Sequence, residues 1–212
     1  MAQNVKAQDW ANLKTYQNKN ATLKPLEPGQ KRIVFMGDSI TELWSVTIPY
    51  FFEGKPYVNR GISGQTTLQM LVRFRPDVIA LKPDIVVIMA GINDIAGNTG
   101  PSTLEMIAGN IFSMAELAKA NNIKVILCSV LPAYDFPWRT GLEPAEKVVT
   151  LNKMIKKYAD ANGILYLDYY AALVGERKGM KAAYADDGVH PNKSGYEVMA
   201  PLVEMAIQSI LK

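Results

Sequence analysis

The chain has 212 residues, which predicts one domain over 1–212, with 1–30 forming an N-terminal helix and lead-in segment. Hydrophobic residues make up 49% of the chain and charged residues 20%, and the net charge of +3 comes from basic residues spread along the sequence, so we expect no nucleic-acid partner. No apolar run reaches the roughly 18 residues that span a bilayer, and the single cysteine, Cys128, excludes a disulfide within the chain and predicts a buried hydrophobic side chain.

The N-terminal part of the chain predicts a short helix and shows no apolar h-region of a signal peptide. Residues 9–19 place Trp10 and Leu13 on one face of that polar helix, and Pro25 and Pro28 follow it. Two localisations are compatible with this start. Either the protein is cytoplasmic, or it is periplasmic or secreted and a signal peptide has been removed before the first residue; we favour the second.

Five apolar runs of strand length follow in chain order. They are nearly continuous in their apolar character instead of alternating with polar residues, which is typical of parallel strands covered on both faces. The runs are 32–36, 56–59, 84–90, 124–130 and 164–168.

Helical patterns separate and follow these runs, at 67–74 leading into 76–81, at 101–121, at 144–162 and at 194–211. Ser102-Thr-Leu-Glu105 has the pattern of a capping box, and Gly163 is expected to end the helix before it. Strands that alternate with helices require crossover connections. The sequence therefore predicts an α/β protein with three α/β/α layers and a five-stranded parallel sheet.

Chemically useful residues stand directly after the predicted strands. In an open parallel sheet, ligands bind at the carboxyl ends of the strands. A serine, a glycine-rich loop and an asparagine follow the first three strands, and carboxylates and a histidine lie near the C-terminus, so we expect all of them at one edge of the sheet. The segments are 37–40, 59–66, 91–94, 131–134 and 186–191.

This set of residues fits acyl transfer. A serine hydroxyl needs a base within hydrogen-bond reach, and His190 is the only histidine available to Ser39. A carboxylate must orient the base; we choose Asp187, three residues before His190, with Asp186 as the runner-up. The oxyanion of the intermediate needs preset donors, which a glycine-rich loop and the amide of Asn93 can supply.

Each of these residues also has a purely structural interpretation. Asp38-Ser39 could cap a helix, which is the interpretation we would favour for that pair alone. Gly61 and Gly64 could shape a turn, and Asn93 could be a turn residue. Their order at successive strand ends is what favours a catalytic site.

Four sequence blocks carry a family resemblance: Gly37-Asp38-Ser39-Ile40, Gly61-Ile62-Ser63-Gly64, Gly91-Ile92-Asn93-Asp94 and Asp187-Gly188-Val189-His190. Together they resemble the blocks of the SGNH hydrolases, also called GDSL-type esterases, with Ile40 in place of the leucine of the family name. The resemblance implies a flavodoxin-like fold, a Ser39 nucleophile and a His190 base. It also implies that the Gly64 amide, with Gly61 as the runner-up, and the Asn93 side chain donate to the oxyanion.

Competing motifs are missing from the sequence. It contains no G-x-S-x-G elbow, no P-loop and no G-x-G-x-x-G fingerprint. A single histidine also argues against a histidine-based zinc site. We therefore predict an enzyme without a metal ion or cofactor.

Aromatic residues follow the fourth strand and the serine. Tyr134, Phe136 and Trp138 form an aromatic loop, and Trp44 follows Ser39 in the sequence. These side chains could line a substrate pocket or cover the core, and the sequence favours neither interpretation. The polar segment 96–100 is expected to be flexible and to border the site.

The resemblance extends to bacterial carbohydrate acetylesterases and to the platelet-activating-factor acetylhydrolase type. It implies removal of short acyl groups, above all acetyl, from a small-molecule or glycan ester. The alternatives are a lysophospholipase, a thioesterase or a platelet-activating-factor-acetylhydrolase-like lipase, and, from another class, a non-catalytic carbohydrate-binding module with the same fold.

Overall fold

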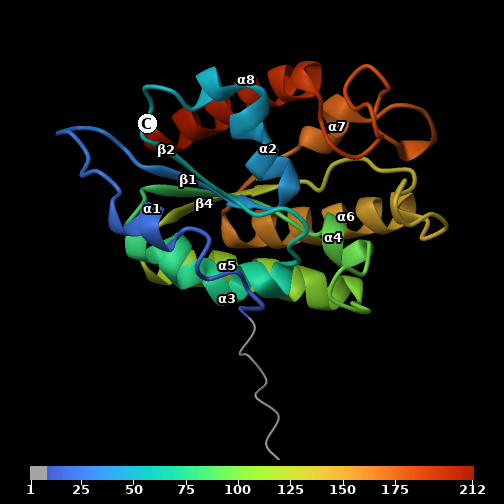
Figure 1. Ribbon diagram of the computed structural model, residues 1–212, viewed down its shortest axis with the longest axis horizontal. Coiled ribbons are helices and arrows are strands. Elements are labelled where there is room, and N and C mark those ends of the chain that lie inside the picture. Colours follow the sequence, from blue (N-terminus) through green and yellow to red (C-terminus); the bar gives the residue numbers. More distant parts are fainter. Residues whose placement is uncertain (1–8) are drawn as a thin grey trace, which may run out of the picture.

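The computed structural model describes residues 9–212, which form a parallel sheet between two layers of helices (Figure 1). All strand pairs are parallel, and the strand order is β2-β1-β3-β4-β5. The strands are β1 (Ile33–Gly37), β2 (Tyr57–Gly61), β3 (Ile85–Met89), β4 (Lys124–Cys128) and β5 (Leu165–Leu167). The predicted α/β class, the parallel sheet and all five strand positions are confirmed.

Helices cover both faces of the sheet, which explains why the strands are apolar throughout. Every residue of β1 and β3 is buried. One face carries α2 (Ser39–Thr47), α7 (Tyr169–Leu173) and α8 (Lys193–Leu211). The other carries α1 (Gln17–Ala21), α3 (Thr67–Asp77), α4 (Ile92–Ile95), α5 (Leu104–Ala120) and α6 (Pro144–Asn162) (Figure 1). Short 3-10 turns complete the chain at η1 (Pro49–Phe51), η2 (Ile79–Leu81) and η3 (Glu176–Lys178).

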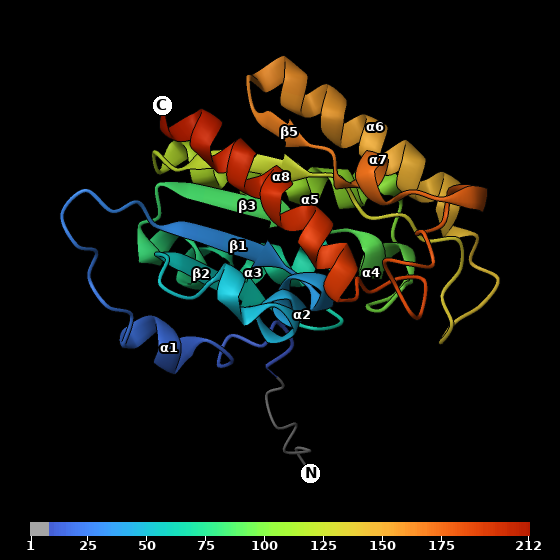
Figure 2. The same cartoon turned by 90° about the horizontal axis from the view of Figure 1, so that it is seen from above.

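The strand order creates a switch point between β1 and β3. From β1 the chain crosses to β2 on one side and then returns to β3 on the other, and α1 lies near β2 while α6 lies near β5 at the opposite edge (Figure 2). Gly37, the last residue of β1, is in register with Gly61 on one side and Met89 on the other. The loops after these residues therefore meet at one crevice, where ligands bind in folds of this kind.

The predicted helix over 9–19 is wrong. The chain instead makes turns, and α1 begins only at Gln17. The Asp9 carboxylate accepts from the amides of Leu13 and Lys14, at 2.8 and 3.0 Å, and Asn12 has a positive φ of 55°. These local hydrogen bonds compete with the helical ladder.

Other element boundaries also differ from the prediction. The cap of α5 is Thr103, whose side chain accepts from the Met106 amide at 3.2 Å, so the expected capping box at Ser102 is wrong by one residue. The short α2 and α7 were not predicted from periodicity. By contrast, α6 spans 144–162 as predicted, and Gly163 ends it with φ 61°.

The core contains two of the aromatic residues whose role, in a substrate pocket or in the core, the sequence did not decide. Trp44 is 1% exposed and packs between Phe51 and Tyr196, with ring centroids 5.0 and 5.4 Å away. Phe136 is fully buried, and so is Cys128, as predicted. Trp44 and Cys128 therefore stabilise the core, whereas Phe136 packs in the core and also borders a cavity. Within residues 9–212, no helix is long and apolar enough to cross a membrane.

Candidate active site

Ser39 lies at the junction of β1 and α2, in the switch-point crevice. Asp38 caps α2, because its side chain accepts from the Ile40 amide at 2.9 Å, and Ser39 is the first residue of the helix. The helix-cap interpretation of this pair is thus correct for Asp38. It does not exclude the chemical one, because Ser39 is held at the amino end of a helix with its hydroxyl toward His190.

Ser39, His190 and Asp187 form a continuous chain of hydrogen bonds. Ser39 Oγ lies 2.9 Å from His190 Nε2, and His190 Nδ1 lies 2.7 Å from Asp187 Oδ2. The other carboxylate oxygen, Asp187 Oδ1, accepts from the backbone amides of Val189 and His190 at 2.9 and 2.7 Å. Asp186, the runner-up, accepts instead from the Asn192 side chain at 3.1 Å.

The two carboxylates near Ser39 have different electrostatic environments. Burial alone would raise the pKa of Asp187, but hydrogen bonds from the His190 ring and from two backbone amides lower it below the ordinary value. Asp38 is 1% exposed, and burial raises its pKa to about 7. Asp187 is therefore held in the charged form that can stabilise an imidazolium, whereas Asp38 is not.

The two candidate glycines, at the end of β2 and in the loop after it, differ in packing and in hydrogen bonding. Gly61 packs against the start of α2 so closely that a Cβ there would lie 2.1 Å from the Glu42 nitrogen, and its own amide donates to Asn59 Oδ1 at 2.8 Å. Gly64 is exposed and has φ 76°, which favours glycine. Because the Gly61 amide is already engaged, Gly64 is the glycine with an amide to offer a ligand.

Asn93 follows β3 and is fixed by two hydrogen bonds. Its Nδ2 donates to the Gln65 carbonyl at 3.1 Å, and its Oδ1 accepts from Asn98 Nδ2 at 3.0 Å. Asn98 also donates to the Gly64 carbonyl at 3.0 Å. One hydrogen of the Asn93 amide thus connects two loops, and the second has no acceptor within residues 9–212, so it can serve a ligand.

Asn98 belongs to the segment 96–100 that the sequence predicted to be flexible and to border the site. The segment is anchored: Arg139 Nη1 donates to the carbonyl of Ala96 at 2.7 Å, and the hydroxyls of Thr66 and Thr99 are 3.0 Å apart. It therefore supports Gly64 and Asn93 through fixed contacts.

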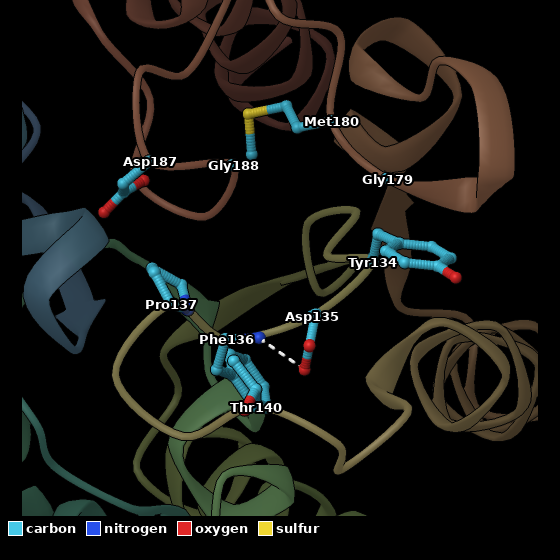
Figure 3. Close-up of a pocket in the computed structure, with 9 residues that line it drawn as sticks. All are labelled: Tyr134, Asp135, Phe136, Pro137, Thr140, Gly179, Met180, Asp187 and Gly188. Carbon is cyan, nitrogen blue, oxygen red and sulfur yellow. Dashed lines mark hydrogen bonds between the residues drawn. The ribbon is translucent and has the colours of Figure 1, made fainter.

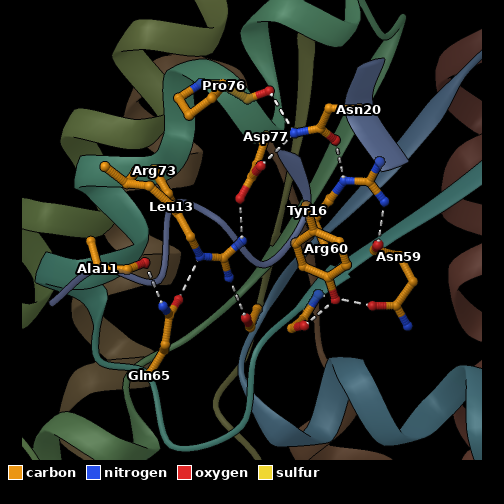
Figure 4. A network of polar contacts seen from close by, with 12 residues as sticks. Ala11, Leu13, Tyr16, Asn20, Asn59, Arg60, Gln65, Arg73, Pro76 and Asp77 are labelled. Carbon is orange, nitrogen blue, oxygen red and sulfur yellow. Dashed lines mark hydrogen bonds and ion pairs between the residues drawn. The ribbon is translucent and has the colours of Figure 1, made fainter. Parts of the chain in front are cut away.

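A buried polar network below the site was not predicted from the sequence (Figure 4). Its centre is Arg73 on α3, which is completely buried and donates to the carbonyl of Gly37, the Gln65 side chain and the Asp77 carboxylate. The N-terminal segment joins the network where the Tyr16 hydroxyl donates to the Gly61 carbonyl. Sequence reasoning missed this network because an Arg on a helix is usually exposed.

Two loops border a cavity beside Asp187 (Figure 3). The loop 134–141 lies on one side and the loop 179–188 on the other, with a cavity of about 270 Å³ between them. Met180 and Gly188 face Phe136 and Thr140 across this cavity. Trp138 is 50% exposed, and its ring centroid lies 5.8 Å from that of His190.

The fold and the site together define an α/β protein with a serine, a histidine and a carboxylate at the switch point of its parallel sheet. Residues 35–198 match the model of the GDSL-like lipase/acylhydrolase family, so the chain belongs to this family of carboxylic ester hydrolases. The expected family resemblance is confirmed.

Individual proteins agree with this assignment. The chain is similar to the crystal structure of a GDSL-like lipase from Bacteroides thetaiotaomicron, with 52% identity, a TM-score of 0.91 and coverage of 94% of this chain and 98% of that one. It is 31% identical to an acetylxylan esterase of Geobacillus stearothermophilus, over 68% of each chain. It is 27% identical to an acetylxylan esterase of Xylanibacter ruminicola over 84% of its own length, but spans only 43% of that longer protein.

Proposed function

We propose that this protein is a serine esterase that removes short acyl groups, acetyl above all, from hydroxyl groups of carbohydrates. The observation that carries the proposal is the hydrogen-bond chain from Ser39 through His190 to Asp187 at the carboxyl edge of the sheet. A serine becomes nucleophilic when a base of this kind takes its proton and a carboxylate orients the base.

The geometry supports a two-step reaction. His190 Nε2 takes the proton of Ser39 Oγ as this oxygen bonds to the ester carbonyl carbon, and Asp187 stabilises the imidazolium. The C–O bond to the alcohol then breaks, His190 returns the proton to the leaving oxygen, and an acyl-serine remains. Water then gives a proton to His190 as its oxygen bonds to the acyl carbon, the bond from this carbon to Ser39 Oγ breaks, and His190 returns the proton to Ser39 as the carboxylic acid leaves.

The developing oxyanion needs donors that are fixed in advance. We assign this role to the free hydrogen of the Asn93 amide, to the Gly64 amide and to the Ser39 amide in the first turn of α2. The first-turn amides of a helix have no partner within the helix, and the positive end of the helix dipole lies there. The contacts of Asn98 with Asn93 and Gly64 hold two of the donors at a fixed separation.

The proposed substrate class comes from the similarity to two proteins named acetylxylan esterases. Exposure of the reacting groups agrees with access for a bulky alcohol: the His190 side chain is 27% exposed, while Ser39 is 7% exposed. A large group can therefore approach from the side of the imidazole.

Two assays test the proposal. The first compares p-nitrophenyl esters from acetate to palmitate, and the second measures acetate released from acetylated xylan. We expect turnover to be highest for acetate, xylan to be deacetylated, and Ser39→Ala to lose several orders of magnitude in kcat with an unchanged circular dichroism spectrum. A preference for long acyl chains would indicate a lipase, and no hydrolysis at all would indicate a binding module.

A further inference from the structure

We propose that Trp138 and the cavity beside Asp187 bind the sugar ring of the leaving alcohol, so that the specificity of this enzyme lies on the alcohol side of the ester. The inference rests on the hydrolase function proposed above. The observation behind it is an aromatic face half open to solvent directly beside the catalytic imidazole.

Trp138 is a fixed surface and not a freely moving side chain. Its ring stacks on that of the fully buried Phe136, with centroids 5.4 Å apart and an interplanar angle of 30°. One face is therefore occupied by the core. The exposed half remains for a ligand, at an angle of 37° to the His190 ring.

Hydrogen bonds within the loop that carries Trp138, and from this loop to the segment 96–100, hold it in place. The Asp135 carboxylate accepts from the amides of Phe136 and Gly141, at 2.9 and 3.1 Å, and Arg139 donates to the carbonyls of Ala96 and Gly97. A surface held in this way loses little conformational entropy when a ligand binds.

The reaction determines which part of the ester lies beside Trp138. His190 must return its proton to the leaving oxygen, so the alcohol lies next to the imidazole. The acyl oxygen lies toward Asn93 and Gly64 instead. Because Trp138 adjoins His190, it contacts the alcohol and not the acyl chain.

The chemistry of the neighbouring cavity favours an uncharged polyhydroxylated alcohol. Its walls combine apolar surface from Pro137 and Met180 with the Asp135 carboxylate and the Thr140 hydroxyl. Of the nine residues that line it in the described part of the chain, none is Lys, Arg or His. A sugar ring offers an apolar C–H face to an aromatic ring and hydroxyl donors to a carboxylate, whereas the anionic phosphate of a phospholipid headgroup would meet negative charge.

The test compares two acetate esters that share the acyl group and differ in the alcohol. Acetylated xylobiose has sugar rings on the alcohol side, and ethyl acetate has none. The variants are Trp138→Ala and Trp138→Phe, with Trp10→Ala as the matched control, since Trp10 is 43% exposed and far along the chain from the catalytic residues. The quantity measured is the ratio of kcat/KM for acetylated xylobiose to kcat/KM for ethyl acetate.

We expect Trp138→Ala to lower this ratio by about tenfold, the size of one aromatic contact. Trp138→Phe should recover part of the loss, and Trp10→Ala should leave the ratio unchanged. An unchanged ratio in Trp138→Ala, or an equal fall of kcat/KM for both esters, would show that Trp138 does not bind the sugar ring, while the proposed hydrolase function would stand. A selective loss on p-nitrophenyl decanoate relative to p-nitrophenyl acetate would show the same. A wild-type protein that hydrolyses none of these esters would overturn both proposals.

Discussion

Replacing Arg73 by methionine is expected to destabilise the protein strongly, because it leaves the Asp77 carboxylate buried without its cation. The two side chains are 0% and 1% exposed, and Arg73 Nη1 lies 3.1 Å from Asp77 Oδ2. The remaining partner of Asp77 is the Asn20 amide at 2.7 Å, which is neutral. Burial lowers the pKa of Arg73, which reflects the cost of placing this charge away from water.

The magnitude follows from the distance and the burial of the pair. At 3.1 Å and an effective dielectric constant of 20, the attraction between two unit charges is about 5 kcal/mol. Removing one partner of a buried pair typically costs about 3–5 kcal/mol, which corresponds to a fall in Tm of about 6–20 °C for a protein of this length. The Gly37 carbonyl also loses one of its two donors and keeps only the Ile62 amide at 3.2 Å, so kcat should fall as the end of β1 relaxes below Ser39.

Urea denaturation followed by circular dichroism measures the effect. Lys156→Met is the matched control, because Lys156 and Asp160 form an ion pair at the same helical spacing with side chains that are 56% and 60% exposed. We expect this control to change the free energy of unfolding by at most about 0.5 kcal/mol. The double variant Arg73→Met/Asp77→Leu should recover part of the loss, since both charges of the pair are removed together. A loss below about 1 kcal/mol in Arg73→Met, or strict additivity in the double variant, would refute the reasoning.

Three further predictions concern the catalytic groups. Asp187→Asn should lower kcat more than Asp186→Asn, because Asp187 contacts the ring of His190; the opposite order would transfer the orienting role. Asn93→Ala should lower kcat by about 10² to 10³ with little change in KM, and Asn98→Ala should lower it less; an unchanged kcat in Asn93→Ala would remove this side chain from the oxyanion site. EDTA should leave ester hydrolysis unchanged, because both ring nitrogens of His190 are already hydrogen bonded, and inactivation reversed by a divalent ion would contradict this expectation.

The sheet was predictable because its signal is local. Strands buried on both faces are apolar at every position, so five short runs identify all five strands. The segment 9–19 was not predictable in the same way, because tertiary contacts determine its conformation. The carbonyls of Trp10 and Ala11 accept from the side chains of Gln69 and Gln65, and these partners are more than fifty residues away in the sequence.

The chemical residues of the site were also predictable, since each follows a strand, but their supports were not. Choosing Asp187 over Asp186 requires the direction of each side chain, which spacing alone does not give. Asn98 and Arg139 are positioned by contacts between loops, and such contacts leave no periodic pattern. The sequence pattern also does not show which way each aromatic side chain points: Trp44 and Phe136 face the core, whereas Trp138 faces solvent.

The carboxyl group of Asp38 should make the stability of the protein depend on pH. Burial raises its pKa from 3.8 to about 7, so the folded state binds this proton more tightly than the unfolded state does. The folded state then holds more protons between about pH 4 and pH 7, and stability falls as the pH rises through this window. At about 1.4 kcal/mol for each pKa unit, the loss is of the order of 4 kcal/mol.

Asp38→Asn removes the titration but keeps an acceptor for the Ile40 amide, because asparagine caps helices about as well as aspartate. The gain in stability of this variant over the wild type should therefore grow from about pH 4 to pH 7 and stay constant above it. Urea denaturation at several pH values measures this difference, in which the titrating groups that do not interact with Asp38 cancel. Asp168→Asn is the control, because Asp168 also caps a helix, accepting from Ala171 at 3.0 Å, but is exposed. A difference between Asp38→Asn and the wild type that stays constant with pH would show that burial of Asp38 does not favour its protonated form.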